Sequence, residues 1–193
     1  MITKHRILAA AQDRFERDGT EGLSMRSLAK DVGLTPMALY RHYADKEALI
    51  DAISVAALED WRDRLAAIEA PSAIASLEAV GEAFLDFALE APRRFEAAFL
   101  LPARNARRFP DDIEAGKSPP LNLVMGHIEQ AQRDGALGDA PPSEIAMTIW
   151  ALSQGLVALY RANRFSDGDT FRATYRAALR RCYASFSQPG PPP

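Results

Sequence analysis

Apolar residues recur along this chain at the spacing of an α-helix, and no stretch keeps the alternation that a β-strand shows. In the first such segment, Ile7, Ala11 and Phe15 share one face. Glycines and prolines separate the segments, as expected at helix ends. The pattern predicts an all-α protein with about nine helices, at residues 3–18, 25–32, 36–43, 46–69, 72–90, 93–101, 121–134, 143–163 and 170–186.

The stretch Ser24–Lys46 organises the N-terminal part of the chain. Gly33 ends a short apolar segment, and glycine readily takes the left-handed conformation in which a helix can stop. Thr35 and Pro36 then supply a side-chain cap and a proline at the first helical position. A short helix, a glycine turn and a second short helix form a helix-turn-helix, whose second helix can enter a DNA major groove.

The second short helix of this stretch divides into two faces. Leu39 and Tyr43 lie four residues apart and are expected to face inward. The core therefore makes little use of the remaining residues: Met37, Ala38, Tyr40, Arg41 and His42. Two short amphipathic helices around a glycine also occur in proteins that never touch DNA, so spacing alone leaves both interpretations open.

The C-terminal part contains a helix, 143–163, that is apolar on nearly every side. Such a helix needs more cover than one small body usually supplies. Small residues along it would also let another helix approach closely: Ala146, Ala151, Ser153, Gly155 and Ala158. We expect a helix-turn-helix domain at 1–45, a helical domain at 46–186, and a disordered tail at 187–193 whose sequence is rich in proline.

Composition narrows the class of protein only modestly. The 193 residues carry a net charge of −3, although residues 1–50 hold eight Lys and Arg against seven Asp and Glu. No apolar run is long enough to span a membrane, and the single cysteine, Cys182, suits a reducing cytoplasm. The three histidines lack metal-ligand spacing, and no phosphate loop or nucleophile elbow occurs. We therefore expect a cytoplasmic protein that is not an enzyme and has no cofactor or metal.

A denser pattern lies at Leu39–Leu49, LYRHYADKEAL. There an aromatic residue, a variable residue, a histidine and a second aromatic residue precede a lysine and a leucine. With this pattern, residues 5–50 resemble the DNA-binding domain of TetR-family transcriptional regulators. The matching positions are Leu23, Arg26, Leu28, Ala29, Gly33, Leu39, Tyr40, His42, Tyr43, Lys46 and Leu49.

The resemblance implies a set of DNA contacts. Pro36, Met37 and Ala38 would face base edges, where short apolar groups touch thymine methyls, and Arg41 would offer a guanidinium fork to guanine. Phosphate contacts fix the register of the protein on the duplex. The residues expected to contact phosphates or complete the footprint are Ser24, Arg26, Thr35, Tyr40, His42 and Lys46.

The resemblance also implies a homodimer on a near-palindromic operator and control by a small-molecule effector. The dimer would supply the missing cover for the helix at 143–163. The residues expected at the interface are Leu152, Leu156, Leu159, Phe171, Tyr175 and Leu179. A largely apolar ligand would sit among Trp61, Phe84, Phe99, Met125, Ile128, Trp150 and Gln154, and its binding would release a repressor from DNA.

Trp150–Gly155 resembles a Trp-x-x-x-His-Gly motif of some family members, with Gln154 in place of the histidine. Two alternatives stay open on the sequence alone. One is a helical small-molecule-binding protein or enzyme whose N-terminal helices are only structural. The other is a regulator of transcription that has no ligand.

Overall fold

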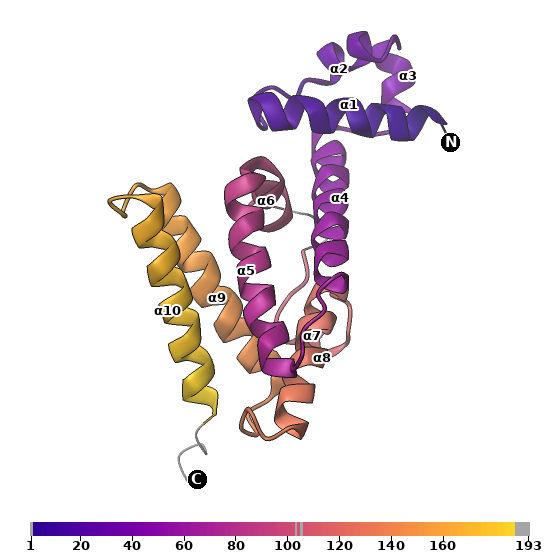
Figure 1. Cartoon of the computed structure of the whole chain (residues 1–193). Coiled ribbons are helices and arrows are strands. Elements are labelled where there is room, and N and C mark those ends of the chain that lie inside the picture. The colour runs from indigo at the N-terminus through magenta and orange to yellow at the C-terminus, as the bar shows by residue number, and fades with distance from the viewer. Residues whose placement is uncertain (1, 103, 105, 188–193) are drawn as a thin grey trace. The chain divides into compact units, whose positions relative to one another are not determined.

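The computed structural model describes residues 2–102, 104 and 106–187, and within these ranges the chain forms ten α-helices and no strand (Figure 1). The all-α prediction is confirmed. The extra helix is α7, a single turn in the proline-rich connection after residue 102, where no apolar repeat pointed to a helix. The helices are α1 Ile2–Asp18, α2 Met25–Asp31, α3 Pro36–Tyr40, α4 Lys46–Ala66, α5 Ala73–Glu90, α6 Pro92–Phe99, α7 Asp111–Glu114, α8 Pro119–Arg133, α9 Pro142–Arg161 and α10 Gly168–Phe186.

Helix α3 is shorter than the sequence pattern indicated and ends at Tyr40 instead of Tyr43. The carbonyl of Leu39 accepts hydrogen bonds from the backbone N–H groups of both His42 and Tyr43, at 2.9 and 3.1 Å, which closes the last turn. The next helix begins soon after, because the Asp45 carboxylate accepts the Ala48 N–H at 2.7 Å and caps α4.

At the C-terminus, α10 ends at Phe186 and Ser187 caps it. The hydroxyl of Ser187 donates to the Ala136 carbonyl at 2.8 Å. The remainder of the tail that was expected to be disordered, 188–193, lies outside the described residues.

The chain divides into two compact units. The first contains the residues up to Asp60 together with 91–106, and the second contains 61–90 and the residues from Arg107 onward. The first unit is therefore larger than the expected 1–45 domain, since it takes in much of α4 and all of α6.

The core of the first unit lies beneath α1 and is shared by five helices. Ile7, Ala11 and Phe15 of α1 are buried with residues of α2, α3 and α4. Ala97 brings α6, which is remote in sequence, into the same core. An ion pair between Arg94 Nε and Glu16 Oε1, 2.8 Å apart, adds a link between α6 and α1.

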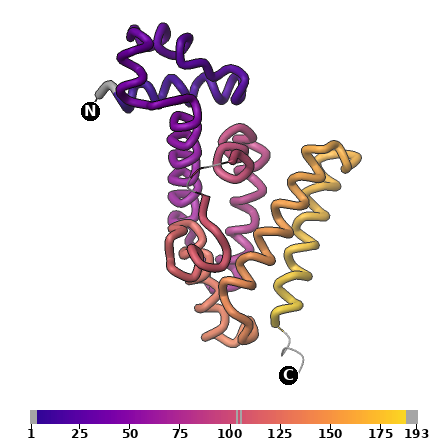
Figure 2. The backbone as a smooth tube through the Cα atoms, turned by 180° about the vertical axis from the view of Figure 1, so that it is seen from behind, coloured from indigo at the N-terminus to yellow at the C-terminus, as the bar shows by residue number. Residues whose placement is uncertain are grey.

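The second unit is a helical bundle in which α5 contacts α8, α9 and α10. Helices α9 and α10 run side by side, as both ribbon views show (Figures 1 and 2). Two buried tyrosines of α10 donate to carbonyls of α5: Tyr175 to Gly81 at 3.0 Å, and Tyr183 to Leu77 at 2.9 Å. Burial raises the pKa of both phenols, so they remain protonated donors at neutral pH.

Gly81 is required where α5 and α10 approach each other. A Cβ at this position would lie 2.6 Å from Leu179 Cδ1, and Leu179 is itself buried. We expect Gly81→Ala to lower the free energy of unfolding by about 1–3 kcal/mol through overpacking. Urea denaturation monitored by circular dichroism measures the change.

Gly126→Ala is the matched control. Gly126 also lies inside a helix, but a Cβ there meets nothing within 4 Å. The higher helix propensity of alanine is then unopposed, and we expect a gain of roughly 0.5–1 kcal/mol. Equal effects of the two substitutions would contradict the close approach at Gly81.

Candidate DNA-binding site

The turn between α2 and α3 is built as its sequence predicts. Gly33 has φ +67°, and the N–H of Leu34 donates to the Ala29 carbonyl at 2.8 Å. The hydroxyl of Thr35 accepts from the Ala38 N–H at 3.2 Å, and Pro36 occupies the first turn of α3. A residue able to adopt positive φ thus ends one helix, and a side-chain cap starts the next.

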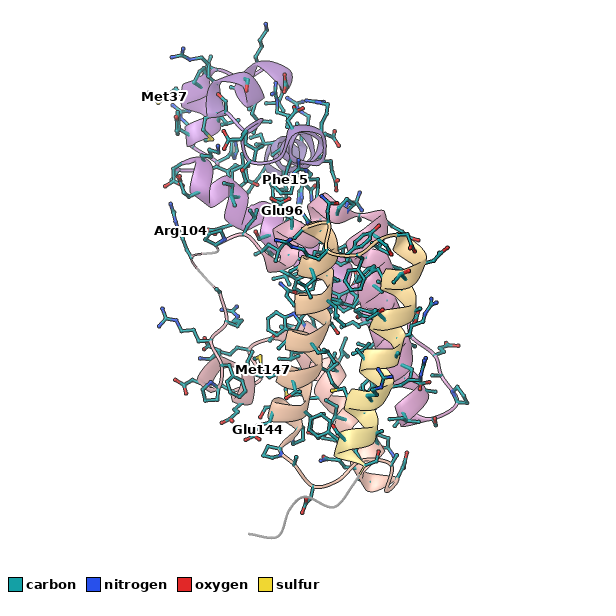
Figure 3. The ribbon with its side chains drawn as sticks, turned by 90° about the vertical axis from the view of Figure 1, so that its left-hand side faces the viewer. Phe15, Met37, Glu96, Arg104, Glu144 and Met147 are labelled. Carbon is teal, nitrogen blue, oxygen red and sulfur yellow. The ribbon has the colours of Figure 1, made fainter. Side chains whose placement is uncertain are left out.

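The two faces of α3 separate as expected. Leu39 and Tyr43 are buried in the first unit. Met37 is 71% exposed and Tyr40 is 48% exposed, so both side chains lie on the outer face of the helix. Met37 lies at the outer edge of the unit in Figure 3. The other predicted DNA contacts on this segment are exposed as well, except half-buried Ala38: Thr35, Pro36, Arg41 and His42.

Helix α2 presents Ser24 and Arg26, both exposed. Ser24 is the residue before α2, but its hydroxyl makes no capping hydrogen bond. Instead, its carbonyl accepts from the Ser27 hydroxyl at 3.1 Å. Both side chains predicted from α2 are therefore accessible to a partner.

Lys46 has a structural partner that the sequence did not reveal. Its Nζ donates to the Thr20 carbonyl at 2.7 Å, in a partly buried contact that fastens the start of α4 to the turn after α1. An ammonium group has three donors, so this bond leaves capacity for a phosphate oxygen. The predicted phosphate contact stays a prediction, with a bracing role added to it.

Helix α1 braces the helix-turn-helix with two arginines that were not among the predicted site residues. Arg6 Nη2 donates to the Val32 carbonyl at 2.7 Å, at the end of α2. Arg14 forms an ion pair with Asp31, and its Nη1 donates to the Gly22 carbonyl at 3.3 Å. The hydrogen bond from Arg14 lowers the pKa of Asp31 below its ordinary value.

A third basic residue of α1 contacts the recognition segment itself. The ammonium of Lys4 lies 5.5 Å from the centroid of the Tyr43 ring, a cation–π contact. The contacts of α1 therefore reach the end of α2 and Tyr43, three residues after the end of α3.

The residues predicted to line a ligand pocket do not all belong to one unit. Phe99 lies in the first unit, where its ring centroid is 5.0 Å from that of Phe95. In the second unit, Trp61 stacks on Phe87 at 5.7 Å and meets Phe84 edge-on at 5.8 Å. The predicted residues of this unit are buried (Trp61, Phe84, Ile128) or half-buried (Met125, Trp150, Gln154).

Three of the six residues predicted for the dimer interface are enclosed by their own chain. Phe171, Tyr175 and Leu179 are at most 4% exposed within a single chain, so they are not available to a partner. The apolar side of α10 is used to cover its own unit: the Phe171 ring stacks on Tyr160 of α9 at 4.3 Å, and Tyr175 bonds to α5. On α9, Leu152 and Leu156 are half-buried, and Leu159 is 49% exposed.

Among the described residues, no group of three His, Cys, Asp or Glu side chains lies close enough to hold one metal ion. No helix in the described ranges is long and apolar enough to cross a membrane.

A short recognition helix with an exposed outer face, braced by the helices before and after it, defines a helix-turn-helix DNA-binding unit. Residues 7–53 match the model of the bacterial regulatory proteins of the tetR family. Residues 77–182, more than half of the chain, match a tetracycline-repressor-like C-terminal domain. The chain therefore belongs to the TetR family of transcriptional regulators and carries the family's DNA-binding domain.

Individual relatives agree with this assignment. The HTH-type transcriptional regulator UidR of Escherichia coli K12 is 30% identical over 81% of this chain and 90% of its own length. The tetracycline repressor of class A from transposon 1721 is 35% identical over 31% of this chain and 33% of its own.

Solved structures share the fold. A TetR-family regulator from Pectobacterium atrosepticum is 25% identical, with a TM-score of 0.73 over 96% of this chain and 94% of its own. A TetR variant from Acinetobacter baumannii, solved with minocycline, is 19% identical, with a TM-score of 0.66 over 93% of each chain.

The cap of α3 can be tested by stability alone. Thr35→Ala removes the acceptor for the Ala38 N–H, and we expect the free energy of unfolding to fall by about 1 kcal/mol. Thr35→Ser retains the hydroxyl and serves as the control. Thermal unfolding of the three proteins measures the difference, and equal stability of the alanine and serine variants would argue against the cap.

Proposed function

We propose that this protein is a dimeric, cytoplasmic repressor that binds a near-palindromic operator through α3 and leaves it when a small, largely apolar molecule binds the second unit. The observation that supports this most directly is the exposed outer face of α3. Contiguous exposed apolar surface that is rimmed by polar residues is typical of an interaction site. Met37 and Tyr40 of α3 lie on that face, and Arg41 follows them directly, while Leu39 on the other face of the helix is buried.

The exposed side chains suit a major groove. Pro36 and Met37 offer apolar surface to thymine methyls, and the Arg41 guanidinium can donate two hydrogen bonds to guanine. Tyr40 and His42 flank these residues and would bind phosphates together with Lys46. Ser24 and Arg26 of α2 would extend the footprint along the backbone of the duplex.

A second copy of the chain would cover α9. With Phe171, Tyr175 and Leu179 buried inside the chain, the proposed interface centres on the outward side of α9. The exposed residues there include three small ones that recur at helical spacing, and a Cβ on Gly155 would meet nothing within 4 Å. The proposed contact residues are Ala151, Leu152, Gly155, Leu156, Ala158 and Leu159.

The effector proposal rests on the second unit. Its interior holds an aromatic cluster around Trp61, whose rings are the kind of side chain that would line a cavity for an apolar ligand, and the A. baumannii protein of the same fold was solved with minocycline. A ligand shifts the equilibrium between two states only by its difference in affinity for them. Titrating the DNA complex with a panel of apolar and aromatic compounds tests the proposal, and a panel without effect would favour a regulator that has no ligand.

DNA recognition is tested by selecting bound duplexes from a random pool. We expect a near-palindromic sequence that binds more weakly as salt rises. Arg41→Ala should relax preference at one base pair per half-site, a loss of about 1–3 kcal/mol of discrimination. Arg17→Ala is the matched control, because Arg17 is an exposed arginine at the end of α1.

The selection also separates the alternatives. If the wild-type protein retains no DNA at low salt, the proposed function fails, and a role in small-molecule binding with structural N-terminal helices would be favoured. If both arginine variants select the same consensus as the wild type, Arg41 does not read a base.

Placing a charged side chain in the proposed interface tests the dimer. Ala158→Glu places a carboxylate on the outward side of α9, and burying it against a second copy would be costly. We expect the wild type to sediment as a dimer at micromolar concentration and the variant as a monomer. Ala115→Glu, at an exposed position after α7, is the control and should remain a dimer. A wild-type monomer would overturn the proposed interface.

A further inference from the structure

Arg104 follows α6 in the sequence, but its side chain lies against the start of α4. Its Nη2 is 3.0 Å from Asp45 Oδ2 and 3.9 Å from Glu47 Oε2, and its Nε is 3.9 Å from Asp51 Oδ2. Its backbone N–H also donates to Asp51 Oδ1 at 3.2 Å. One arginine thus contacts the three carboxylates that lie at and just beyond the start of α4.

The carboxylates nearest the start of α4 stabilise the helix but would repel a DNA partner. Negative charge is stabilising at a helix N-terminus, where Glu47 lies in the first turn and Asp45 caps α4 through the Ala48 N–H. That hydrogen bond, with the one from Arg104, holds the pKa of Asp45 below its ordinary range. Asp45 is therefore ionised at neutral pH, and it directly precedes Lys46 in the sequence.

The same charges lie beside the proposed DNA-binding surface. With Lys46, the three carboxylates sum to −2, and Arg104 reduces this to −1. Charges interact over about 10 Å at 0.1 M salt, and Lys46 lies between Asp45 and Glu47 in the sequence, so a phosphate bound by Lys46 would be repelled by these carboxylates. Each uncompensated carboxylate would then repel the DNA backbone.

The position of Arg104 near the proposed DNA-binding surface is fixed by the packing of α6. The residue belongs to the first unit, with the helix-turn-helix, and Met37 and Arg104 lie along the same edge of the view in Figure 3. The preceding helix α6 is fixed in that unit by buried Ala97 and by the ion pair of Arg94 with Glu16. The guanidinium is therefore delivered to α4 by a segment packed into the same core.

We propose that Arg104 is a determinant of DNA affinity outside the helix-turn-helix, which acts by neutralising the acidic start of α4. The proposal rests on the proposed DNA-binding function and adds a residue to it. Because Arg104 acts through charge and not through a base, its effect is the same for every sequence. Its effect also weakens as salt screens the carboxylates.

The experiment compares wild type, Arg104→Gln and the double variant Arg104→Gln/Asp51→Asn on two duplexes of equal length, the selected operator and an unrelated sequence. We expect Arg104→Gln to bind both duplexes about three- to tenfold more weakly near 0.1 M salt, and the deficit to shrink toward 0.3 M. Removing the Asp51 charge in the double variant should restore binding to within about twofold of wild type.

Arg133→Gln is the matched control. Arg133 is an equally exposed arginine in α8 of the second unit, and it lies 3.9 Å from Glu129. The substitution changes the net charge by the same amount, and binding should stay within about twofold of wild type. Thermal unfolding of each variant verifies that it is folded before binding is measured.

The outcomes separate this inference from the function on which it rests. A folded wild type that binds neither duplex overturns the proposed function, and this inference with it. A wild type that binds while Arg104→Gln binds equally well overturns the inference alone. A deficit that is constant with salt and is not relieved by Asp51→Asn also overturns it, because it would indicate a purely structural tether.

Discussion

The DNA-binding unit depends on the burial of two side chains of the recognition segment, Leu39 and Tyr43. Helix α3 has five residues, which is too short to be stable alone in water, because nucleating a helix costs more than one turn returns. Its position is therefore imposed by the core beneath α1, to which Phe15 contributes. Arg6 and Arg14 then fix α1 to the end of α2, so the outer face of α3 is presented by a scaffold that surrounds it. Exposed Met37 is tolerable because the inner face of the same helix is so well buried.

In the second unit, the contact between α5 and α10 decides what surface is left for a partner. Gly81 lets α10 come close enough for Tyr175 to donate to a carbonyl of α5, and the apolar side of α10 is consumed in that contact. The surface that remains for a partner is the outward side of α9, which is lined by small residues such as Gly155 and Ala158, with Leu159 at its end. Small residues allow close backbone approach, so an interface built on them would gain from shape more than from large anchors.

Local signals in the sequence were sufficient to predict nine of the ten helices in the described residues, but not the tertiary contacts that these helices make. Gly33, Thr35 and Pro36 each act within a few residues, and the turn they predict is present. The alternation of buried and exposed positions on α3 was also predictable from spacing. The apolar face of α10 was correctly identified, but sequence spacing cannot say whether such a face covers its own chain or a second copy. Lys46 bonding to a carbonyl 26 residues away, and Arg104 reaching across 59 residues to Asp45, are products of tertiary packing with no local signature.

A protein with a net charge of −3 that binds a polyanion must arrange its charges locally. Three cations of the first unit have structural roles, because Arg6 and Arg14 hold α1 to the helix-turn-helix and Lys46 bonds to the turn after α1. The acidic start of α4 adds a conflict. Its carboxylates stabilise the helix, but they lie where a DNA phosphate is expected to bind and would repel it. An arginine that neutralises those carboxylates from a neighbouring segment resolves the conflict without adding a cation to the recognition surface itself. Affinity for DNA then depends on where α6 delivers that arginine, as well as on the residues that face the groove.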